Sequence, residues 1–452
     1  MNLLDPLFGS AEMDRVFSDA RRLQRMLDFE AALAAAEAQA GVIPKSAVPA
    51  IQAQCHADRF DLGDLAQKAM LAGNLAIPMV KQLTERVAQN DPTAARYVHW
   101  GATSQDAIDT GTVLQLRDAF TILNGNLRRI ASRLTHLVER YRSTPVAGRT
   151  WMQHAVPTVL GLKFAGWLDA LLRHQSRLQE LRIRVLVLQF GGAAGTLGTL
   201  GNKGLAVSEA LANELGLVLP ALPWHSHRDR IAEVGSFLAL LMGTLGKIAR
   251  DVSLEMQTEV AELAEPAGEG RGGSSSMPHK RNPVACSAIL SAATRVPGLA
   301  STLFSAMLQE NERGLGGWQA EWETLPEMLH LTAGALERGI DLLDGLEIRP
   351  DEMIRNLDRT RGLIFAEAAA MALAAKVGKA EAHGLIEAAS RRAVSEGQHL
   401  RDVLLADPEV TAHLQADEIR RLFDPMACTG VANEFMDRVL DASRAWLGKE
   451  GS

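Results

Sequence analysis

Apolar side chains repeat at alternating steps of four and three residues along three stretches of the chain. They run through Leu116 to Tyr141, Leu160 to Leu188 and Ile231 to Val252. This spacing places the apolar residues on one face of a helix that packs along another helix. Two further segments, at about 284–311 and 322–345, have a less regular helical period. The pattern therefore predicts a central bundle of five long helices.

The periodic segments on either side of this bundle are shorter. One covers Ala11 to Ala40, and others cover Ile364 to Val377 and Ala380 to Glu396. No segment has a convincing strand pattern. The length of 452 residues suggests about three domains. We therefore expect an all-α protein with three helical domains, which cover residues 1–110, 111–349 and 350–452.

The long apolar faces also bear on assembly. Faces of about thirty residues are longer than one compact monomer usually buries, so other subunits are expected to cover part of them. A long stalk is the competing interpretation. It is less favoured because charged loops and glycine runs interrupt the repeat.

Composition narrows the class of protein. The formal charge of −7 argues against nucleic acid as the main partner. Cys55, Cys286 and Cys428 are scattered, which fits a reducing cytosol better than a disulfide framework. The spacing of His, Cys, Asp and Glu predicts no metal site and no cofactor. The first ten residues do not resemble a signal peptide, so we expect a cytoplasmic protein.

The uncharged stretch Val185 to Asn202 is about as long as a bilayer is thick. It contains Gln189 and five glycines between Gly191 and Gly201. Glycine at this density disfavours a helix, so a helix that ends in a loop is preferred to a membrane span. The following Gly-Asn-Lys-Gly lacks the Ser or Thr of a phosphate-binding loop.

The segment 270–283 reads GRGGSSSMPHKRNP and is the strongest candidate for chemistry. Asn282 and Pro283 are typical of a helix start, and Asn282 is the expected cap. Ser274 to Lys280 would then lie near the positive end of a helix dipole, where an anion binds well. Glycines at 270, 272 and 273 would let the loop close over a substrate. A disordered linker explains the glycines but not the Met-Pro-His-Lys-Arg-Asn-Pro run.

Three carboxylates precede this loop. The apolar repeat ends at Val252, and its next positions are Glu255 and Glu259, followed by Glu262. A row of carboxylates on a helix is most often a solvated face. Since the row leads into the loop, these carboxylates could instead support the residues of the candidate site, and both interpretations stay open.

Two sequence blocks resemble a known superfamily. The loop resembles G-S-S-x-M-P-x-K-x-N-P of the fumarase/aspartase superfamily, whose enzymes make or break a bond beside a carboxylate through a carbanion. Residues 98–106 resemble V-H-x-G-x-T-S-x-D of its adenylosuccinate lyases, although alone they would suit a helix start. The resemblance implies a tetramer and a small polycarboxylate substrate. It also implies catalytic roles for Ser274, Lys280 and His99, and substrate contacts from Thr103, Ser104, Ser275 and Asn282.

A third block, Gly148 to Pro157, departs from the superfamily pattern R-T-H-x-Q-x-A-x-P. Trp151 stands where the lyases have a histidine that serves the leaving group, and Asn74 replaces a second expected histidine. We expect this block to open the second long helix, with Trp151, Gln153 and His154 as candidate substrate contacts. For His154, a histidine satisfied by its neighbours is an equally good interpretation.

The missing histidines favour a particular chemistry. An amine or hydroxide needs a proton as it leaves, whereas a carboxylate with a pKa near ~4 does not. The whole chain resembles the superfamily's bacterial cycloisomerases, which close a lactone by adding a substrate carboxylate to a conjugated double bond. Residues 311–318 lack the polar, nucleotide-facing positions of adenylosuccinate lyases. His225 to Arg228 loosely resembles a segment that reaches a neighbouring subunit's site.

Two alternatives remain. One is a lyase that releases fumarate from a succinyl adduct. The other is a non-catalytic member of the superfamily, which is disfavoured because Ser274, Lys280, Asn282 and His99 are all present.

Overall fold

The computed structural model of the protein describes residues 3–268, 270–274, 276–277 and 279–448. The chain forms two compact units, each made of separate stretches. The first unit comprises Met1–Leu127, His174–Leu245 and Ala288–Glu337, and the second comprises Arg128–Arg173, Gly246–Ser287 and Arg338–Ser452. The three-domain division expected from the sequence stays a prediction.

Five helices in the described part of the chain are longer than 21 residues, where the apolar periodicity predicts them. They are α7 (Ser104–Arg140), α8 (Leu160–Val185), α10 (Asp229–Glu255), α11 (Val284–Ser305) and α12 (Gly317–Asp344). The apolar faces of α7, α8 and α10 are buried, as Leu123, Leu171 and Leu241 illustrate at 0% exposure. The expected helical fold is confirmed.

The first unit also contains shorter helices, some of which share an apolar core. They are α1 (Asp5–Phe8), α2 (Ala11–Val16), α3 (Asp19–Gln39), α4 (Ala47–Gln52), α5 (Leu62–Ala72), α6 (Ala76–Asn90) and α9 (Gly204–Leu215), with 3₁₀ turns η1 (Ala57–Arg59), η2 (Ala94–Tyr97) and η3 (Gly198–Lys203). The helix expected over 11–40 is divided because Ser18 caps α3, accepting from the Arg21 N–H at 3.3 Å. Leu27 of α3 and Met79 and Leu83 of α6 are among the side chains in this core.

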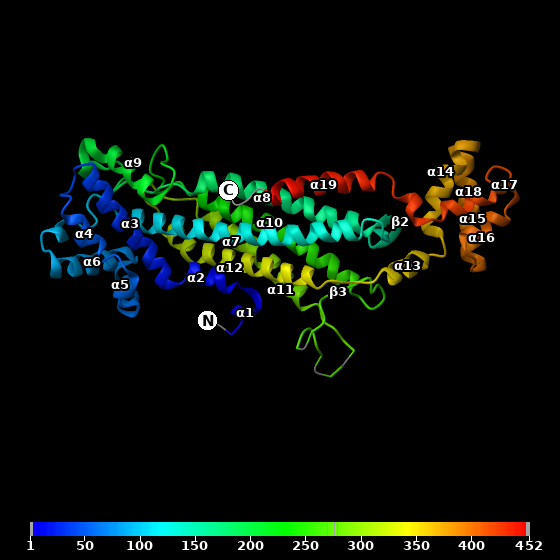
Figure 1. Ribbon diagram of the computed structural model, residues 1–452, viewed down its shortest axis with the longest axis horizontal. Coiled ribbons are helices and arrows are strands. Elements are labelled where there is room, and N and C mark those ends of the chain that lie inside the picture. The colour runs from blue at the N-terminus through cyan, green and yellow to red at the C-terminus, as the bar shows by residue number, and fades with distance from the viewer. Residues whose placement is uncertain (1–2, 269, 275, 278, 449–452) are drawn as a thin grey trace. The chain divides into compact units, whose positions relative to one another are not determined.

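The second unit contains a set of short helices near the C-terminus. They are α13 (Pro350–Asp358), α14 (Ala366–Val377), α15 (Lys379–Glu396), α16 (Leu400–Ala406), α17 (Pro408–Thr411), α18 (Ala416–Leu422) and α19 (Ala432–Leu447), with η4 (Leu363–Phe365) and η5 (Pro425–Cys428). α14, α15, α16 and α18 lie together in Figure 1 and share an apolar core. α19 instead packs on the end of α7, where the hydroxyls of Thr135 and Ser443 are 2.8 Å apart.

An antiparallel hairpin in the second unit contradicts the expectation that the chain has no strands. β1 (Pro145–Thr150) pairs with β2 (Gln153–Val159), and β3 (Leu263–Ala264) pairs with β4 (Glu347–Ile348). Trp151 and Met152 alone form the hairpin turn, with φ of 51° and 65°. Such turns usually carry Asn-Gly or Asp-Gly, so Trp-Met gives no turn signal. The third sequence block therefore forms the hairpin and ends just before α8, rather than opening that helix.

Two helices, α10 and α11, are long and apolar enough to cross a membrane by length and composition alone. Core helices of soluble proteins meet the same criteria, and 61% of the most apolar window of α10 is buried inside the protein. The uncharged stretch that begins at Val185 leaves its helix there and continues as a loop into η3, as expected. The burial of α10 is therefore that of a core helix.

Candidate active site

His99 lies in a short connection between η2 and α7 in the first unit. Its backbone has a φ of 57°, and its Nδ1 is 2.6 Å from Oε1 of Glu30 on α3. The Glu30 side chain is 1% exposed and that of His99 is 15% exposed. Burial alone lowers the pKa of His99, but the negative charge and hydrogen bond of Glu30 outweigh burial and raise it. Glu30 therefore holds the imidazole in one orientation and favours its protonated form.

Asp106 fixes the segment that carries the Thr-Ser pair. Its carboxylate accepts from the backbone N–H of Thr103 at 3.0 Å, which closes the start of α7. It also accepts from the N–H groups of Gly191 and Gly192, at 3.0 and 2.9 Å, and lies 2.7 Å from Nε2 of His225. All these partners lie in the first unit. The glycine run thus packs against the segment from His99 to Ser104.

In the segment from His225 to Arg228, the first and last residues are buried and His227 is exposed. His225 is 3% and Arg228 2% exposed within the first unit. The guanidinium of Arg228 forms ion pairs with Asp109 at 2.7 Å and with Glu321 at 2.5 Å. These contacts hold both ends of the segment in the first unit, and a contact of His227 with a neighbouring subunit stays a prediction.

Arg313 is a functional candidate that sequence reasoning missed. Its Nη1 donates to the Thr103 hydroxyl at 2.9 Å, and its Nη2 donates to the Ala193 carbonyl at 3.0 Å. It forms no ion pair with any carboxylate of the described residues. A guanidinium that is held by neutral acceptors keeps its charge available for a carboxylate. In the sequence, Arg313 stands at the arginine of the adenylosuccinate-lyase pattern H-E-R-D-x-S-x-S, and this match could have identified it.

The hairpin in the second unit is anchored at its base and exposed at its tip. Both terminal nitrogens of Arg149 donate to the buried Glu262 carboxylate, at 2.9 and 2.6 Å. His154 faces Arg149 across the hairpin, and burial together with the nearby arginine charge lowers its pKa. Trp151 at the tip is 98% exposed, and Gln153 beside it is also exposed. The tip residues contact little of their own unit.

The loop at 270–283 is fastened at both ends. Arg271 pairs with Asp341 at 2.5 Å, and Arg281 pairs with Glu347 at 2.8 Å. The Asn282 N–H donates to the Gly272 carbonyl at 2.8 Å. Gly272 has a φ of 62°, and a side chain there would overlap the Asn282 carbonyl, so glycine is required.

The proposed catalytic residues lie between these anchors. The Ser274 hydroxyl accepts from the Met277 N–H at 3.2 Å. Lys280 is exposed and has no ion pair with the described carboxylates, in contrast to the two loop arginines. Ser275, a predicted substrate contact, lies outside the described residues. Lys280 is thus the loop cation whose charge is available to an incoming anion.

The start of α11 corrects one prediction. The N–H groups of Ala285 and Cys286 donate to the Glu265 carboxylate, at 3.0 and 2.8 Å. Glu265, and not Asn282, therefore caps this helix with its side chain. Because a buried carboxylate already occupies the helix end, the dipole is not free to bind a substrate anion there.

The row of carboxylates before the loop also differs from a solvated face. Glu255, the last residue of α10, is buried and pairs with Lys163, and its pKa is raised by burial against the opposing lysine charge. Glu262 is buried beneath the hairpin, where Asn356 also donates to it at 2.8 Å. Glu259 alone is exposed. Glu262 therefore supports the hairpin, whereas Glu255 joins the end of α10 to α8.

The candidate residues fall into separate groups. His99, Thr103 and Ser104 share one segment of the first unit. The second unit holds Trp151, Gln153 and His154 on the hairpin and Ser274, Lys280 and Asn282 in the loop. Hairpin and loop are linked through the stretch from Glu262, which binds Arg149, to Glu265, whose carbonyl accepts from Arg281 at 2.5 Å.

Comparison with known proteins places this arrangement in a family. A family model described as "Lyase" matches residues 9–298, which is more than half of the chain. The chain belongs to the fumarase/aspartase superfamily. A second model, described as "Adenylosuccinate lyase C-terminus", matches residues 362–439. The sequence resemblance to the superfamily is thereby confirmed.

Three similar members of the superfamily are named for one activity. The 3-carboxy-cis,cis-muconate cycloisomerase of Pseudomonas aeruginosa is 56% identical over 448 residues, which cover 99% of this chain and 97% of that protein. The enzyme of the same name from Bradyrhizobium diazoefficiens is 56% identical over 97% of this chain and 98% of its own length. The crystal structure of the 3-carboxy-cis,cis-muconate lactonizing enzyme from Pseudomonas putida has a TM-score of 0.94 and 52% identity, covering 98% and 99% of the two chains.

Proposed function

We infer that the protein is a cycloisomerase that closes 3-carboxy-cis,cis-muconate to 4-carboxymuconolactone, a step of protocatechuate breakdown in the β-ketoadipate pathway. The observation that carries this proposal is the 56% identity to a cycloisomerase over 99% of the chain. The superfamily fold and the retained loop at 270–283 agree with it. Cytoplasmic location follows as part of the same proposal, since the chain resembles soluble metabolic enzymes.

The proposed reaction is a conjugate addition within one molecule. One substrate carboxylate oxygen bonds to an alkene carbon, and the displaced π electrons move onto a second carboxylate as an enolate-like dianion. A proton then bonds to the neighbouring carbon and returns the electrons to it. The trianionic substrate takes up one proton and becomes a dianionic lactone. Ser274 is the proposed proton donor to that carbon.

Positive charge near the developing dianion would lower the barrier. We assign this role to Lys280, whose charge is not paired among the described residues. Asn282, Thr103 and Ser104 are assigned as hydrogen-bond donors to the substrate carboxylates. Arg313, already bonded to the Thr103 hydroxyl, is added to this set. His99, held by Glu30, is assigned a catalytic role as a protonated imidazole beside the same substrate.

The residue at the tip of the hairpin agrees with a reaction that needs no acid to protonate a leaving group. Trp151 replaces the histidine of the superfamily lyases, and an indole ring cannot donate the proton that a departing amine needs. A carboxylate nucleophile requires no such donor. We therefore assign Trp151, Gln153 and His154 to the binding of substrate and not to proton transfer.

Assembly is the second part of the proposal. Trp151 is 98% exposed, and only 39% of the most apolar window of α11 is buried within one chain. Exposed apolar side chains and poorly buried apolar helices are typical of surfaces that another subunit covers. We propose a homotetramer in which the hairpin, the loop and the His99 segment of different subunits form each site.

A direct assay separates this function from its alternative. Incubation with 3-carboxy-cis,cis-muconate should abolish the absorbance of the conjugated diene and consume one proton for each molecule converted. Adenylosuccinate should release no fumarate. The opposite pair of results would assign the chain to the fumarate-releasing lyases, and inactivity toward both would favour a non-catalytic member.

Ser274→Ala tests the catalytic assignment. Loss of the proton donor should reduce kcat by roughly 10²-fold or more, with the helical circular dichroism unchanged. Ser276→Ala is the matched control, because it removes a hydroxyl from the same loop without touching the assigned donor. A Ser274→Ala variant with the rate of the parent would remove Ser274 from the mechanism.

A further inference from the structure

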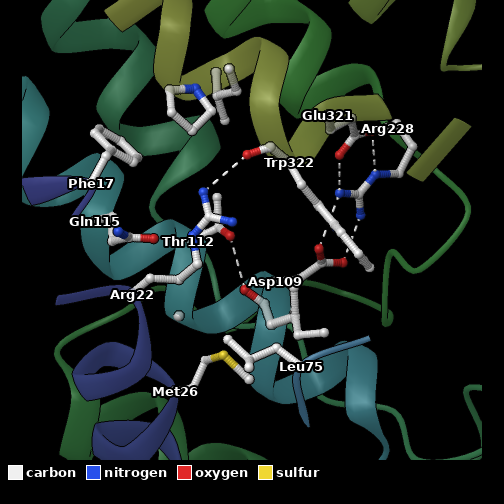
Figure 2. A pocket seen from close by; sticks show the side chains of 14 residues that line it. Phe17, Arg22, Met26, Leu75, Asp109, Thr112, Gln115, Arg228, Glu321 and Trp322 are labelled. Atoms are coloured by element: carbon white, nitrogen blue, oxygen red, sulfur yellow. Dashed lines mark hydrogen bonds and ion pairs between the residues drawn. The ribbon is translucent and has the colours of Figure 1, made fainter. Parts of the chain in front are cut away.

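The segment from His225 to Arg228 is fastened to the first turns of α7 at two places, and the proposed reaction uses neither contact. At one end, Nε2 of His225 lies 2.7 Å from the carboxylate of Asp106. At the other end, Arg228 pairs with Asp109 and Glu321, as Figure 2 shows. Asp106 and Asp109 lie one helical turn apart, so the segment meets two successive carboxylates on the same face of α7.

The surroundings of His225 fix the position of its imidazole. The side chain of Gln105 donates to the His225 carbonyl at 2.8 Å and to Asp109 at 3.0 Å, which ties the backbone of the segment to α7. The residue is 3% exposed, and a side-chain carbon on Gly191 would lie 2.9 Å from its Cε1 atom. A buried ring held on both sides keeps its Nε2 directed at Asp106.

Asp106 gathers the backbone of the candidate site around one carboxylate. Its oxygens also accept from four N–H groups, at 2.9 to 3.2 Å, which belong to Thr103, Gln189, Gly191 and Gly192. Oxygens that face this many donors only accept, so Nε2 of His225 must carry a hydrogen and donate it to Asp106. His225 is thus a donor on which the position of this carboxylate depends.

Thr103 is held from two sides. Its N–H donates to Asp106 at 3.0 Å, and its hydroxyl lies 2.9 Å from Nη1 of Arg313. A guanidinium has no acceptor atom, so the Thr103 oxygen accepts from Arg313 and its own hydrogen points elsewhere. That hydrogen can be donated to a substrate carboxylate, and its direction depends on the position of the Thr103 backbone.

From these contacts we propose that His225 is a positioning residue for substrate binding, which acts through Asp106 on the hydroxyl of Thr103. The inference rests on the proposed function, in which Thr103 binds a substrate carboxylate. Without the His225 donor, the Asp106 carboxylate shifts toward its remaining partners and moves the Thr103 N–H with it. Because Thr103 contacts the substrate both before and during the reaction, this shift raises KM and leaves kcat near that of the parent.

A double-mutant cycle separates this role from a general effect on stability. His225→Ala and Thr103→Val should each raise KM about tenfold, with a smaller change in kcat. The double variant should have the KM of Thr103→Val alone, since His225 acts through the hydroxyl that this variant lacks. His225→Gln, whose amide can reach Asp106 and donate to it, should restore the KM of the parent. His174→Ala is the matched control, because it removes another buried histidine of the first unit, bonded to Thr244 at 2.7 Å, and should lower stability without a change in KM.

Binding can be measured without turnover by using butane-1,2,4-tricarboxylate, the saturated analogue of the proposed substrate. In titration calorimetry on the full-length protein, its Kd should change among the variants as KM does. A parent that binds this analogue but does not convert 3-carboxy-cis,cis-muconate would contradict the proposed function, and the affinities of the variants would still decide the role of His225.

Three results would overturn the role of His225. They are a folded His225→Ala protein with the affinity of the parent, losses from His225→Ala and Thr103→Val that multiply in the double variant, and a His225→Gln protein as weak as His225→Ala. Circular dichroism establishes that each variant is folded. If His225→Ala is not, His225→Asn takes its place, because its shorter side chain does not reach Asp106.

Discussion

The buried carboxyl of Glu37 gives a quantitative test of how this protein responds to pH. Glu37 lies on α3 at 0% exposure, and neither of its side-chain oxygens has a hydrogen-bond partner. Burial, with a smaller contribution from the charge of Glu30, raises its pKa from 4.5 to about 9. The folded protein therefore holds Glu37 in the neutral form at pH 7.

The raised pKa of Glu37 makes the stability of the fold depend on pH. Below pH 4.5 Glu37 is protonated in both the folded and the unfolded chain, so it carries no pH-dependent cost. As pH rises from 4.5 toward 9, the unfolded chain releases this proton and the folded chain keeps it, so stability falls. Since a tenfold change in proton concentration corresponds to about 1.36 kcal/mol, the cost is about 0.8 kcal/mol at pH 5 and about 4.7 kcal/mol at pH 8.

Glu37→Gln removes this titration while keeping the shape of the side chain. The variant should resemble the parent at pH 5, and should gain about 4 kcal/mol of stability relative to the parent between pH 5 and pH 8. Thermal unfolding of both proteins at each pH measures the difference, in which titrations common to both proteins cancel. Glu12→Gln, on the exposed surface of α2, is the matched control. A parent-to-variant difference that stays constant over this pH range would refute the assignment of a raised pKa to burial.

Two further predictions concern the candidate active site. Glu30→Gln removes the negative charge that raises the pKa of His99, so the limb of the kcat/KM profile that reports His99 should move to lower pH. Asp28→Asn on the same helix is the control, and an unmoved limb in Glu30→Gln would exclude Glu30 as the positioning residue. Mixing inactive Ser274→Ala and His99→Ala proteins after reversible dissociation should restore about a quarter of the activity if different subunits supply the two residues. No recovery in reassembled tetramers would mean that one chain supplies both.

The long helices were predictable because their apolar repeats extend over many turns. In α7, α8 and α10 the same face stays buried from one turn to the next, so the periodic signal accumulates. The division of the 11–40 segment was also within reach, since Ser18 is a typical helix cap. Local signals of this kind depend on residues that are close in sequence.

The hairpin and the cap of α11 were not predictable for the opposite reason. Trp151 and Met152 adopt left-handed backbone conformations that are uncommon for these residue types, so their identity misleads. Glu265 caps a helix that begins 19 residues later.

The hydrogen-bond partners of the candidate residues could not be predicted, because they are far away in the sequence. Glu30 and His99 are 69 positions apart, and Asp106 and His225 are 119 apart. Motif resemblance selected His99 and Thr103, but only the fold shows that Glu30 and Arg313 bind them. Such pairings depend on tertiary packing and not on local propensity.

The Glu265 cap has a consequence for how the loop can evolve. The carboxylate that caps α11 belongs to Glu265, which precedes the loop in the sequence. The first N–H groups of the helix therefore keep their hydrogen bonds when side chains of the loop change. The ion pairs of Arg271 and Arg281, like the required Gly272, lie outside the stretch from Gly273 to Lys280. The contacts that hold the ends of the loop are therefore independent of the side chains between them. Those side chains can change to suit a new substrate without destabilising the helix bundle.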